Sequence, residues 1–363
     1  MQQNIKKIFY CLEEYLETDV DLQKINILHL YFNKNKINDA TMSDMCIKLR
    51  ENINVQDLTL ALSENKFGQN SLSTLALELQ NLIYLKYLYL NIIQNKLNDE
   101  KISTLANSLG KCQKLESLNL QINKNQMTNK GVEYLAIGLR NCLSINTLEI
   151  QLSNIEIGSN TLKQFFMMLK TCESLKNLTL GLSQCTISSQ RDINSFEGLR
   201  DFKNLENLNL DLDQNQIYDN QIGLLGKELG FLANLISVNL GLDVNQISSN
   251  GFYNFIEGLS NCQSIFSLKL YLGYQNNMFQ KEDIFLKNQF SKFQNLNYFI
   301  LDLSSNQITD VKAKQLSYEL KQSETITTLF VNMSRNQIGS DKTNQIIANL
   351  KKAKRLVKLQ TYI

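Results

Sequence analysis

Four of the seven cysteines recur at one position of a repeating pattern. They are Cys112, Cys142, Cys172 and Cys262, in the segments KCQKL, NCLSI, TCESL and NCQSI. Thiolates brought together by a repeat could hold a metal ion or form a disulfide. Phe202 and Leu232 take the same position in two other copies, and a thiolate metal site would not accept them. The pattern therefore favours small buried thiols that fill a tight corner before a strand.

The single histidine is a weak candidate for catalysis. His29 lies between Leu28 and Leu30, so strand alternation places it on a surface, with no nearby Cys or Ser constellation to form a nucleophile. The chain also has no phosphate-binding G-x-x-x-x-G-K-[ST], no G-x-S-x-G and no set of kinase motifs. We therefore expect a chain that is not an enzyme and that binds no cofactor and no metal.

The elements that position these residues follow a repeat of thirty residues. The pattern L-x-x-L-x-L-x-L-x-x-N-x-I begins at Ile25, Val55, Leu85, Leu115, Ile145, Leu175, Leu205, Leu235, Ile265, Leu296, Ile326 and Leu356. One added residue near 273–280 accounts for the single longer interval. Drift this small leaves no room for a linker or a second domain. We predict an N-terminal capping helix within residues 1–24, helical over 4–18, and a solenoid of about twelve units over 25–363, the last one incomplete.

Each unit combines a strand with a helix. Leu208, Leu210 and Leu212 alternate with polar residues, as in a strand with one buried face. Apolar residues over 132–139 recur at i, i+3, i+4 and i+7, which is typical of a half-buried helix. Parallel strands stack about 4.8 Å apart and helices about 10 Å apart, so the stack should curve. The predicted fold is an α/β solenoid, a curved horseshoe with parallel strands on its concave face and helices on its convex face.

An asparagine recurs at the eleventh position of the pattern. It is present as Asn35, Asn65, Asn95, Asn125, Asn215, Asn245, Asn306 and Asn336. Its amide has two donors and one acceptor for backbone groups that turn away from water. Ile155, Cys185 and Gln275 replace it in three units, and we expect those turns to be the least regular.

This pattern resembles the leucine-rich repeat family, in its ribonuclease-inhibitor-like subtype with long helical units. The family motif is L-x-x-L-x-L-x-x-N-x-L, and the two extra residues here predict longer strands than usual. Asn or Cys is the family's usual choice at the ladder position, which matches Cys185. The resemblance covers residues 25–363.

The expected concave face carries a distinctive set of side chains. The predicted protein-binding residues are His29, Tyr31, Tyr87, Tyr89, Glu149, Asp211, Asp213, Asp243, Lys269, Tyr271, Tyr298, Phe330 and Tyr362. Aromatic residues at both ends flank an acidic centre. Exposed aromatic residues are enriched at binding hot spots, although tyrosine also suits strand geometry. We expect a protein or peptide partner that places basic groups on the carboxylates and apolar groups on the tyrosines.

Charge and hydropathy argue against nucleic acid and membrane partners. The net charge of +2 does not indicate nucleic acid, and no apolar run is as long as a membrane span. Three glutamates interrupt the N-terminal apolar residues, so we expect no secretory signal and a cytoplasmic protein with free thiols.

Alternative functions stay open. Some long-helix leucine-rich repeat proteins activate a small GTPase, but those typically end in an acidic tail, whereas this chain ends in KKAKRLVKLQTYI. Others inhibit ribonucleases and are richer in cysteine. A third possibility is a structural subunit of a large cytoskeletal or ciliary assembly. The strand expected near the C-terminus would then be an edge for a partner to cover, unless the preceding KKAKRLVK only protects it.

Overall fold

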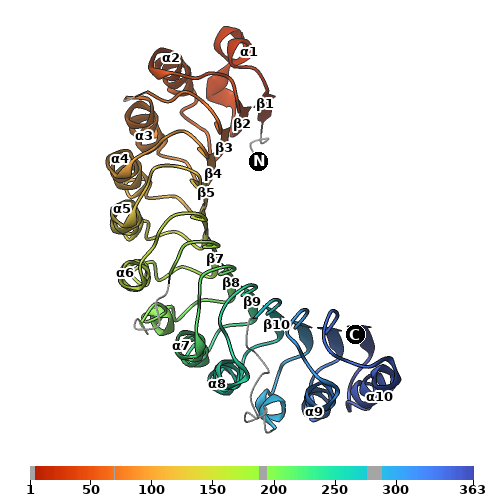
Figure 1. Ribbon diagram of the computed structural model, residues 1–363. Coiled ribbons are helices and arrows are strands. Elements are labelled where there is room, and N and C mark those ends of the chain that lie inside the picture. The colour runs from red at the N-terminus through yellow and green to blue at the C-terminus, as the bar shows by residue number, and fades with distance from the viewer. Residues whose placement is uncertain (1–4, 69, 188–193, 276–287) are drawn as a thin grey trace. The chain divides into compact units, whose positions relative to one another are not determined.

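The computed structural model describes residues 5–68, 70–187, 194–275 and 288–363. They form two compact units. The first comprises Met1–Ile157 and Met168–Gly181, and the second comprises Gly158–Met167 and Leu182–Ile363. In each unit the strands form one layer and the helices form another (Figure 1).

The strands are parallel, and their order in the sheet follows the chain. The first unit holds β1 (Lys6–Phe9), β2 (Ile27–Tyr31), β3 (Asp57–Ala61), β4 (Tyr87–Asn91), β5 (Ser117–Gln121), β6 (Thr147–Gln151) and β7 (Asn177–Gly181). The second holds β8 (Asn207–Asp211), β9 (Ser237–Gly241), β10 (Ser267–Tyr271), β11 (Tyr298–Asp302), β12 (Thr328–Asn332) and β13 (Lys358–Tyr362). Equivalent residues of successive repeats lie opposite each other, as Leu208 does with Val238.

The helices follow the strands in most repeats. They are α1 (Leu12–Glu17), α2 (Asp39–Leu49), α3 (Ser71–Asn81), α4 (Asp99–Leu109), α5 (Asn129–Leu139), α6 (Ser159–Leu169), α7 (Asp219–Gly230), α8 (Ser249–Leu259), α9 (Asp310–Lys321) and α10 (Ser340–Leu350). Short 3₁₀ turns are present at η1 (Leu22–Lys24), η2 (Leu199–Asp201) and η3 (Gln289–Lys292). Asn38 caps α2 by accepting from the backbone of Ala40 and Thr41.

The core lies between the two layers, as the two periodicities predict. Leu208, Leu210 and Leu212 are buried, and so are the apolar columns of the helices over 132–139 and 252–259. β8 ends at Asp211 and has five residues, the length of an average strand. That the strands exceed the usual length in the leucine-rich repeat family stays a prediction. Leu212 still donates its N–H to the carbonyl of Gly241 at 2.8 Å. The chain then turns through Gln214, which has a φ of 57°.

The recurring asparagine connects successive turns within a unit. The Nδ2 of Asn245 donates to the carbonyls of Leu212 and Leu242 at 3.0 and 2.9 Å. Its Oδ1 accepts the backbone N–H groups of Asn215 and Ile217 at 3.1 and 2.9 Å. Asn65, Asn95, Asn125, Asn215, Asn306 and Asn336 donate to backbone carbonyls of the preceding repeat in the same way. We call this series the asparagine ladder.

Not every departure from asparagine interrupts the ladder. Gln275 donates from Nε2 to Leu242 at 2.7 Å and accepts from Ile247 at 3.1 Å, so the expectation of an irregular turn was wrong there. The longer side chain makes the same kinds of bond. Cys185 and Ile155 are buried but carry no amide to repeat this pattern.

The N-terminal prediction needs a correction. Residues 6–9 form β1 and not the first turns of a helix, and the helix itself is limited to Leu12–Glu17. Phe9 lies opposite Leu30 of β2. The segment therefore pairs with the backbone groups along the edge of β2, which a helix could not do. The buried Tyr15 of α1 accepts from the amide of Asn52 at 3.2 Å.

Asn245→Ala tests the asparagine ladder. It leaves three buried backbone groups without a partner, while the carbonyl of Leu242 keeps Gln275, and we expect the free energy of unfolding to fall by about 2–4 kcal/mol. Asn35→Ala is the control, because the amide of Asn35 makes a local bond to Asn33 at 2.9 Å, and a loss of about 0.5 kcal/mol or less is expected. Urea unfolding followed by circular dichroism measures both. Equal losses in the two variants would contradict the role of the ladder.

Candidate functional site

The predicted binding residues lie on the side of the sheet away from the helices, which we call the strand face. None of them belongs to the buried core; Tyr87 and Tyr362 are exposed and the rest are half-buried. His29, Tyr31, Tyr87, Tyr89 and Glu149 belong to the first unit, and Asp211, Asp213, Asp243, Lys269, Tyr271, Tyr298, Phe330 and Tyr362 belong to the second. The predicted residues are therefore divided between the two units.

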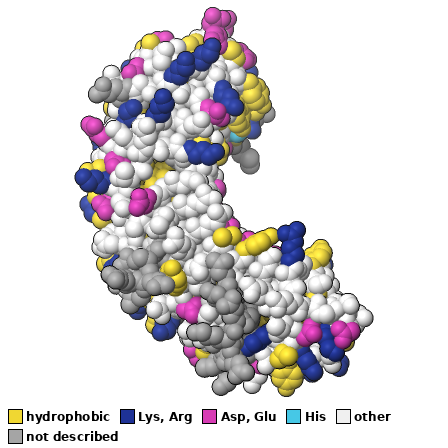
Figure 2. Space-filling model, in the orientation of Figure 1, with side chains coloured by type: hydrophobic (Ala, Val, Ile, Leu, Met, Phe, Trp, Pro, Cys, Tyr) yellow, Lys and Arg dark blue, Asp and Glu magenta, His cyan; other side chains and the backbone are white. Residues whose placement is uncertain are grey.

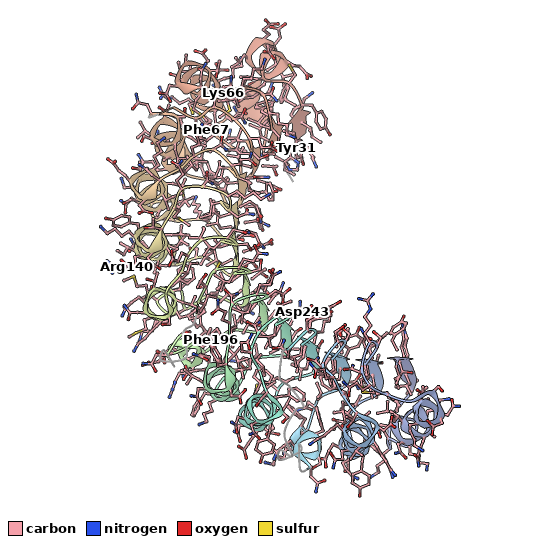
Figure 3. All side chains as sticks on the ribbon, in the orientation of Figure 1. Tyr31, Lys66, Phe67, Arg140, Phe196 and Asp243 are labelled. Carbon is pink, nitrogen blue, oxygen red and sulfur yellow. The ribbon has the colours of Figure 1, made fainter. Side chains whose placement is uncertain are left out.

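An aromatic cluster stands at the start of the first unit. Tyr10 stacks on Tyr31 with ring centroids 5.4 Å apart, and His29 meets Tyr31 edge-on at 6.2 Å. Figure 3 shows Tyr31 beside the strands of the first unit. Only 15% of the His29 side chain is exposed, and its Nε2 is 3.8 Å from Asp57 Oδ1. Burial, with the nearby charge of Lys6, lowers the pKa of His29. The lowered pKa favours the neutral imidazole, which packs within this ring cluster.

Four carboxylates of the second unit form what we call the acidic row: Asp211, Asp213, Asp243 and Asp302. Asp213 Oδ1 accepts the backbone N–H of Asp243 at 2.8 Å, and Asp243 Oδ1 accepts that of Gly273 at 2.6 Å. Asp243 lies on the strand side of its unit in Figure 3. Asp213 and Asp243 thus reach the backbone of the next repeat, whereas Asp211 and Asp302 accept from the backbone of their own repeat, at Asp213 and Ser304. These bonds fix the positions of the charges.

The acidic row lacks compensating cations. Burial raises the pKa of Asp213 to about 6, and the charges of Asp211 and Asp243 add to the effect. Burial also raises the pKa of Asp243, with contributions from Asp302 and Asp211. Within the described residues no lysine or arginine forms an ion pair with any of the four. Desolvation and mutual repulsion both act against the charged form, so a cation supplied from outside would be favoured here.

Aromatic and cationic side chains continue this surface beyond the acidic row. Lys269 Nζ lies 5.7 Å from the ring centroid of Tyr298, and the Tyr298 ring lies 5.9 Å from that of Phe330. Lys358 Nζ lies 5.1 Å from the Phe330 ring. Burial raises the pKa of Tyr271, and Asp302 and Asp243 contribute to the rise. The strand face of the second unit therefore offers carboxylates and apolar rings on adjacent strands.

Sequence reasoning did not select three residues that shape these surfaces. Tyr10 was missed because residues 6–9 were predicted as helix, which hid its contact with Tyr31. Asp57 was missed because it is an ordinary polar residue of an alternating strand, just before the leucines of β3. Its position beside His29 follows from the register between β2 and β3. Lys358 was taken with its run of basic neighbours as a protective charge.

The recurring cysteines are buried, as favoured above. Their sulfurs approach backbone carbonyls of the preceding repeat: Cys112 to Leu79 at 3.5 Å, Cys142 to Leu109 at 3.4 Å, Cys172 to Leu139 at 3.4 Å and Cys262 to Leu232 at 2.9 Å. Burial raises the pKa of Cys112 and that of Cys172 to about 11. Protonated thiols that donate to carbonyls hold the corner between helix and strand.

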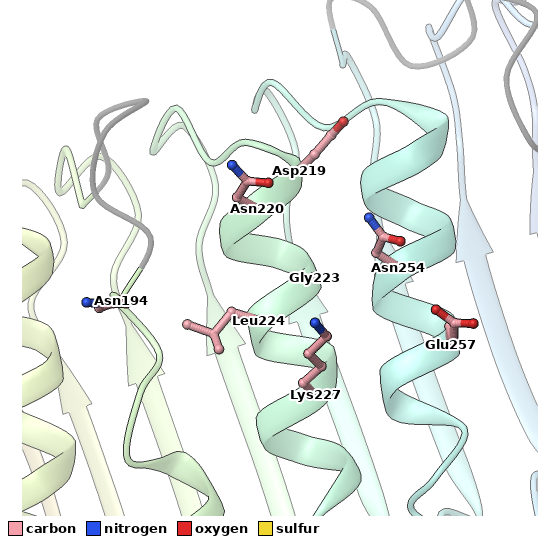
Figure 4. A pocket seen from close by; sticks show the side chains of 8 residues that line it. All are labelled: Asn194, Asp219, Asn220, Gly223, Leu224, Lys227, Asn254 and Glu257. Carbon is pink, nitrogen blue, oxygen red and sulfur yellow. The ribbon is translucent and has the colours of Figure 1, made fainter.

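A pocket of about 440 Å³ opens in the helix layer of the second unit (Figure 4). Gly223 and Leu224 of α7 line it, and the described residues just before β8 contain a 3₁₀ turn in place of a helix beside α7. Asp219 in the pocket accepts the N–H of Ser248 at 2.7 Å, and Glu257 accepts from the hydroxyl of Tyr253 at 3.2 Å. These carboxylates have structural partners, so the pocket does not present an acid and base pair.

The described residues lack both a metal-binding cluster and a membrane-spanning helix. They hold no group of three or more His, Cys, Asp or Glu side chains that could bind a metal ion. They also hold no helix long and apolar enough to cross a bilayer.

A parallel sheet in chain order, a thirty-residue strand–helix repeat and an asparagine ladder define a leucine-rich repeat solenoid. A solved structure with a similar fold is a chain in the crystal structure of the Rad7 and Elc1 complex in yeast. The TM-score is 0.51 and the identity 16%, over 94% of this chain and 79% of that one. This likeness concerns the fold alone. The sequence matches no protein-family model and no curated protein sequence.

Asp213→Asn tests the electrostatics of the acidic row. The pKa of Asp213 is higher in the folded chain than its ordinary value of 3.8, so the folded chain binds more protons between about pH 4 and 6 and loses stability as the pH rises through this range. The amide can still accept from Asp243. We expect the variant to be more stable than the native chain at pH 7, by about 1 kcal/mol after allowance for solvent screening, and to show no gain at pH 4.

Urea unfolding at both pH values measures this difference. Asp44→Asn, at an exposed position in α2, is the control and should behave alike at both. A gain for Asp213→Asn that is the same at pH 4 and pH 7 would show that charge is not its cause.

Proposed function

We propose that the chain is a non-catalytic scaffold that binds a protein or peptide partner on its strand face. The observation that carries the proposal is the acidic row of the second unit, whose carboxylates are partly buried and lack cations among the described residues. The partner places basic groups against Asp211, Asp213 and Asp243, and apolar groups against the neighbouring tyrosines.

Energetics favour this arrangement. A basic side chain that pairs with a partly desolvated carboxylate gains more than a pair at an open surface, and it relieves the repulsion within the row. The rings of Tyr298 and Phe330 supply an apolar anchor of the kind found at binding hot spots. The strands carry both groups on a rigid backbone, so little conformational entropy is lost on binding.

The proposals on subtype, location and alternative functions rest on the same fold. We assign the solenoid to the ribonuclease-inhibitor-like subtype because its repeats have helices of about eleven residues, and we expect a cytoplasmic location. The similar yeast chain comes from a complex of two proteins, which supports a role in protein assembly. Activation of a small GTPase and a structural role in a large cytoskeletal or ciliary assembly are the alternatives. A GTP-hydrolysis assay with a panel of small GTPases tests the first, and we expect no acceleration.

Quantitative affinity purification tests the scaffold proposal. The strand-face variant combines Asp211→Asn, Asp243→Asn and Tyr271→Ala. We expect the amount of the main captured partner to fall about tenfold, because two charge contacts and one aromatic contact are lost.

The control variant makes the same kinds of change in α9 and α10 and in the loop that follows α9. It combines Asp341→Asn, Glu324→Gln and Tyr318→Ala, all at exposed positions of the second unit. Circular dichroism should show both variants folded. If the control loses the partner and the strand-face variant retains it, the partner binds the helices and the proposal fails.

A further inference from the structure

The turns of the first unit carry a second charged surface. Each turn has an asparagine at its centre, which belongs to the ladder in all but the first turn, and the residues on either side of it are exposed. Four successive turns place residues 34 and 36, 64 and 66, 94 and 96, and 124 and 126 in this way, and we call these residues the turn edge. They include Lys34, Lys36, Lys66, Lys96 and Lys124, all exposed, and the acid Glu64.

The asparagine ladder fixes the backbone that carries these lysines. Asn65 accepts the N–H of Ile37 at 3.0 Å, and its own N–H donates to Asn95 Oδ1 at 3.0 Å. The N–H of Lys66 donates to the carbonyl of Ile37 at 2.9 Å. Adjacent turns are thus held at the spacing of adjacent strands, about 4.8 Å. Like charges at this separation repel one another, which an anionic ligand would relieve.

Little in the described structure compensates the charge. Glu64 Oε1 lies 3.3 Å from Lys34 Nζ, so the one acid of the turn edge already has a lysine partner. Within the described residues no ion pair engages Lys66, Lys96 or Lys124. Figure 2 shows several lysine and arginine side chains over the first unit.

These three lysines line one groove of about 450 Å³. The rest of its wall is formed by Glu64 and by the side chains of two asparagines and two glutamines. No aromatic or aliphatic side chain lines it. Its chemistry therefore suits a strongly polar, anionic ligand.

The corresponding turns of the second unit carry one cation among the described flanking residues, Arg335. The flanking residues there are Gln184 and Thr186, Gln214 and Gln216, Val244 and Gln246, Tyr274, Ser305 and Gln307, and Arg335 and Gln337. Gln184 and Gln214 have φ values of 56° and 57°, close to the 57° of Lys96 and of Lys124. The turn conformation does not require lysine, so the fold alone does not account for the basic row.

We propose that the groove on the turn edge of the first unit, lined by Lys66, Lys96 and Lys124, binds an extended acidic peptide. The ammonium groups contact the carboxylates of the peptide. Asn65 and Asn125 are used by the ladder, but the side-chain amides of Gln94 and Gln126 can both donate and accept, which matches the C=O and N–H groups of a peptide backbone. A nucleic acid strand fits less well, because single-strand sites use aromatic side chains for base stacking and this groove has none. The inference is independent of the strand face, whose acidic row would repel such a peptide.

Fluorescence anisotropy with a labelled ten-residue peptide of alternating Glu and Gly tests the proposal. The probe variant is Lys66→Gln, Lys96→Gln and Lys124→Gln, since glutamine already occupies this turn conformation elsewhere in the chain. We expect its Kd to rise about tenfold at low ionic strength, as three exposed charge contacts are lost. The control is Lys314→Gln, Lys351→Gln and Lys352→Gln, at exposed positions of the second unit, and its Kd should stay within about twofold of the native value.

Three results would overturn the proposal. The first is no measurable binding of the peptide by the native chain. The second is an equal loss in the probe and control variants, which would mean that net charge and not this groove attracts the peptide. The third is tighter, equally lysine-dependent binding of a single-stranded oligonucleotide, which would assign the groove to nucleic acid. Urea unfolding of the probe variant should match the native chain.

Discussion

The constraint on which this structure depends is the satisfaction of backbone groups where each strand ends. At that point the chain leaves the sheet, turns sharply and enters the helix layer, and its N–H and C=O groups become buried without strand partners. The ladder asparagines supply those partners across neighbouring repeats. Gln275 performs the same task with one more methylene, which shows that the amide matters more than the residue type.

This constraint also decides how the surface is organised. Because successive repeats stay in register, equivalent outward residues stand side by side, and a charge that recurs once per repeat becomes a row. In the second unit carboxylates gather beside aromatic rings on the strand face. In the first unit lysines gather on the turn edge. The same scaffold therefore presents surfaces of opposite sign at different positions of the repeat.

The repeat, the strand–helix alternation and the direction of most strand residues could be predicted from the sequence, because a period of two and a period of about 3.6 alternate in most units. The conformation of residues 6–9 could not, since Ile5, Ile8 and Phe9 also fit a helical face and only pairing with β2 makes them a strand. The position of the acidic row could be predicted from alternation. Its raised pKa values could not, because they follow from burial and from carboxylates contributed by different repeats.

The contacts that bury His29 could not be predicted from the sequence either. Tyr31 lies on the same strand as His29, but Asp57 comes from the next strand. The lysine groove shows the same limit. Its residues come from consecutive turns. A lysine in one turn does not predict a site, and the lysines come together only when the turns stack. Sequence periodicity thus predicts which residues face outward, while the chemistry of a surface depends on what neighbouring repeats place beside them.

Carboxyl footprinting of the chain with and without its purified partner measures the central claim most directly. A carbodiimide and an amine label accessible carboxylates, and mass spectrometry reads the labelling of each one. The account predicts that the partner protects Asp211 and Asp243, while the labelling of Glu324 and Asp341 in the helix layer is unchanged. Protection of Glu324 and Asp341 with unchanged labelling of Asp211 and Asp243 would contradict it.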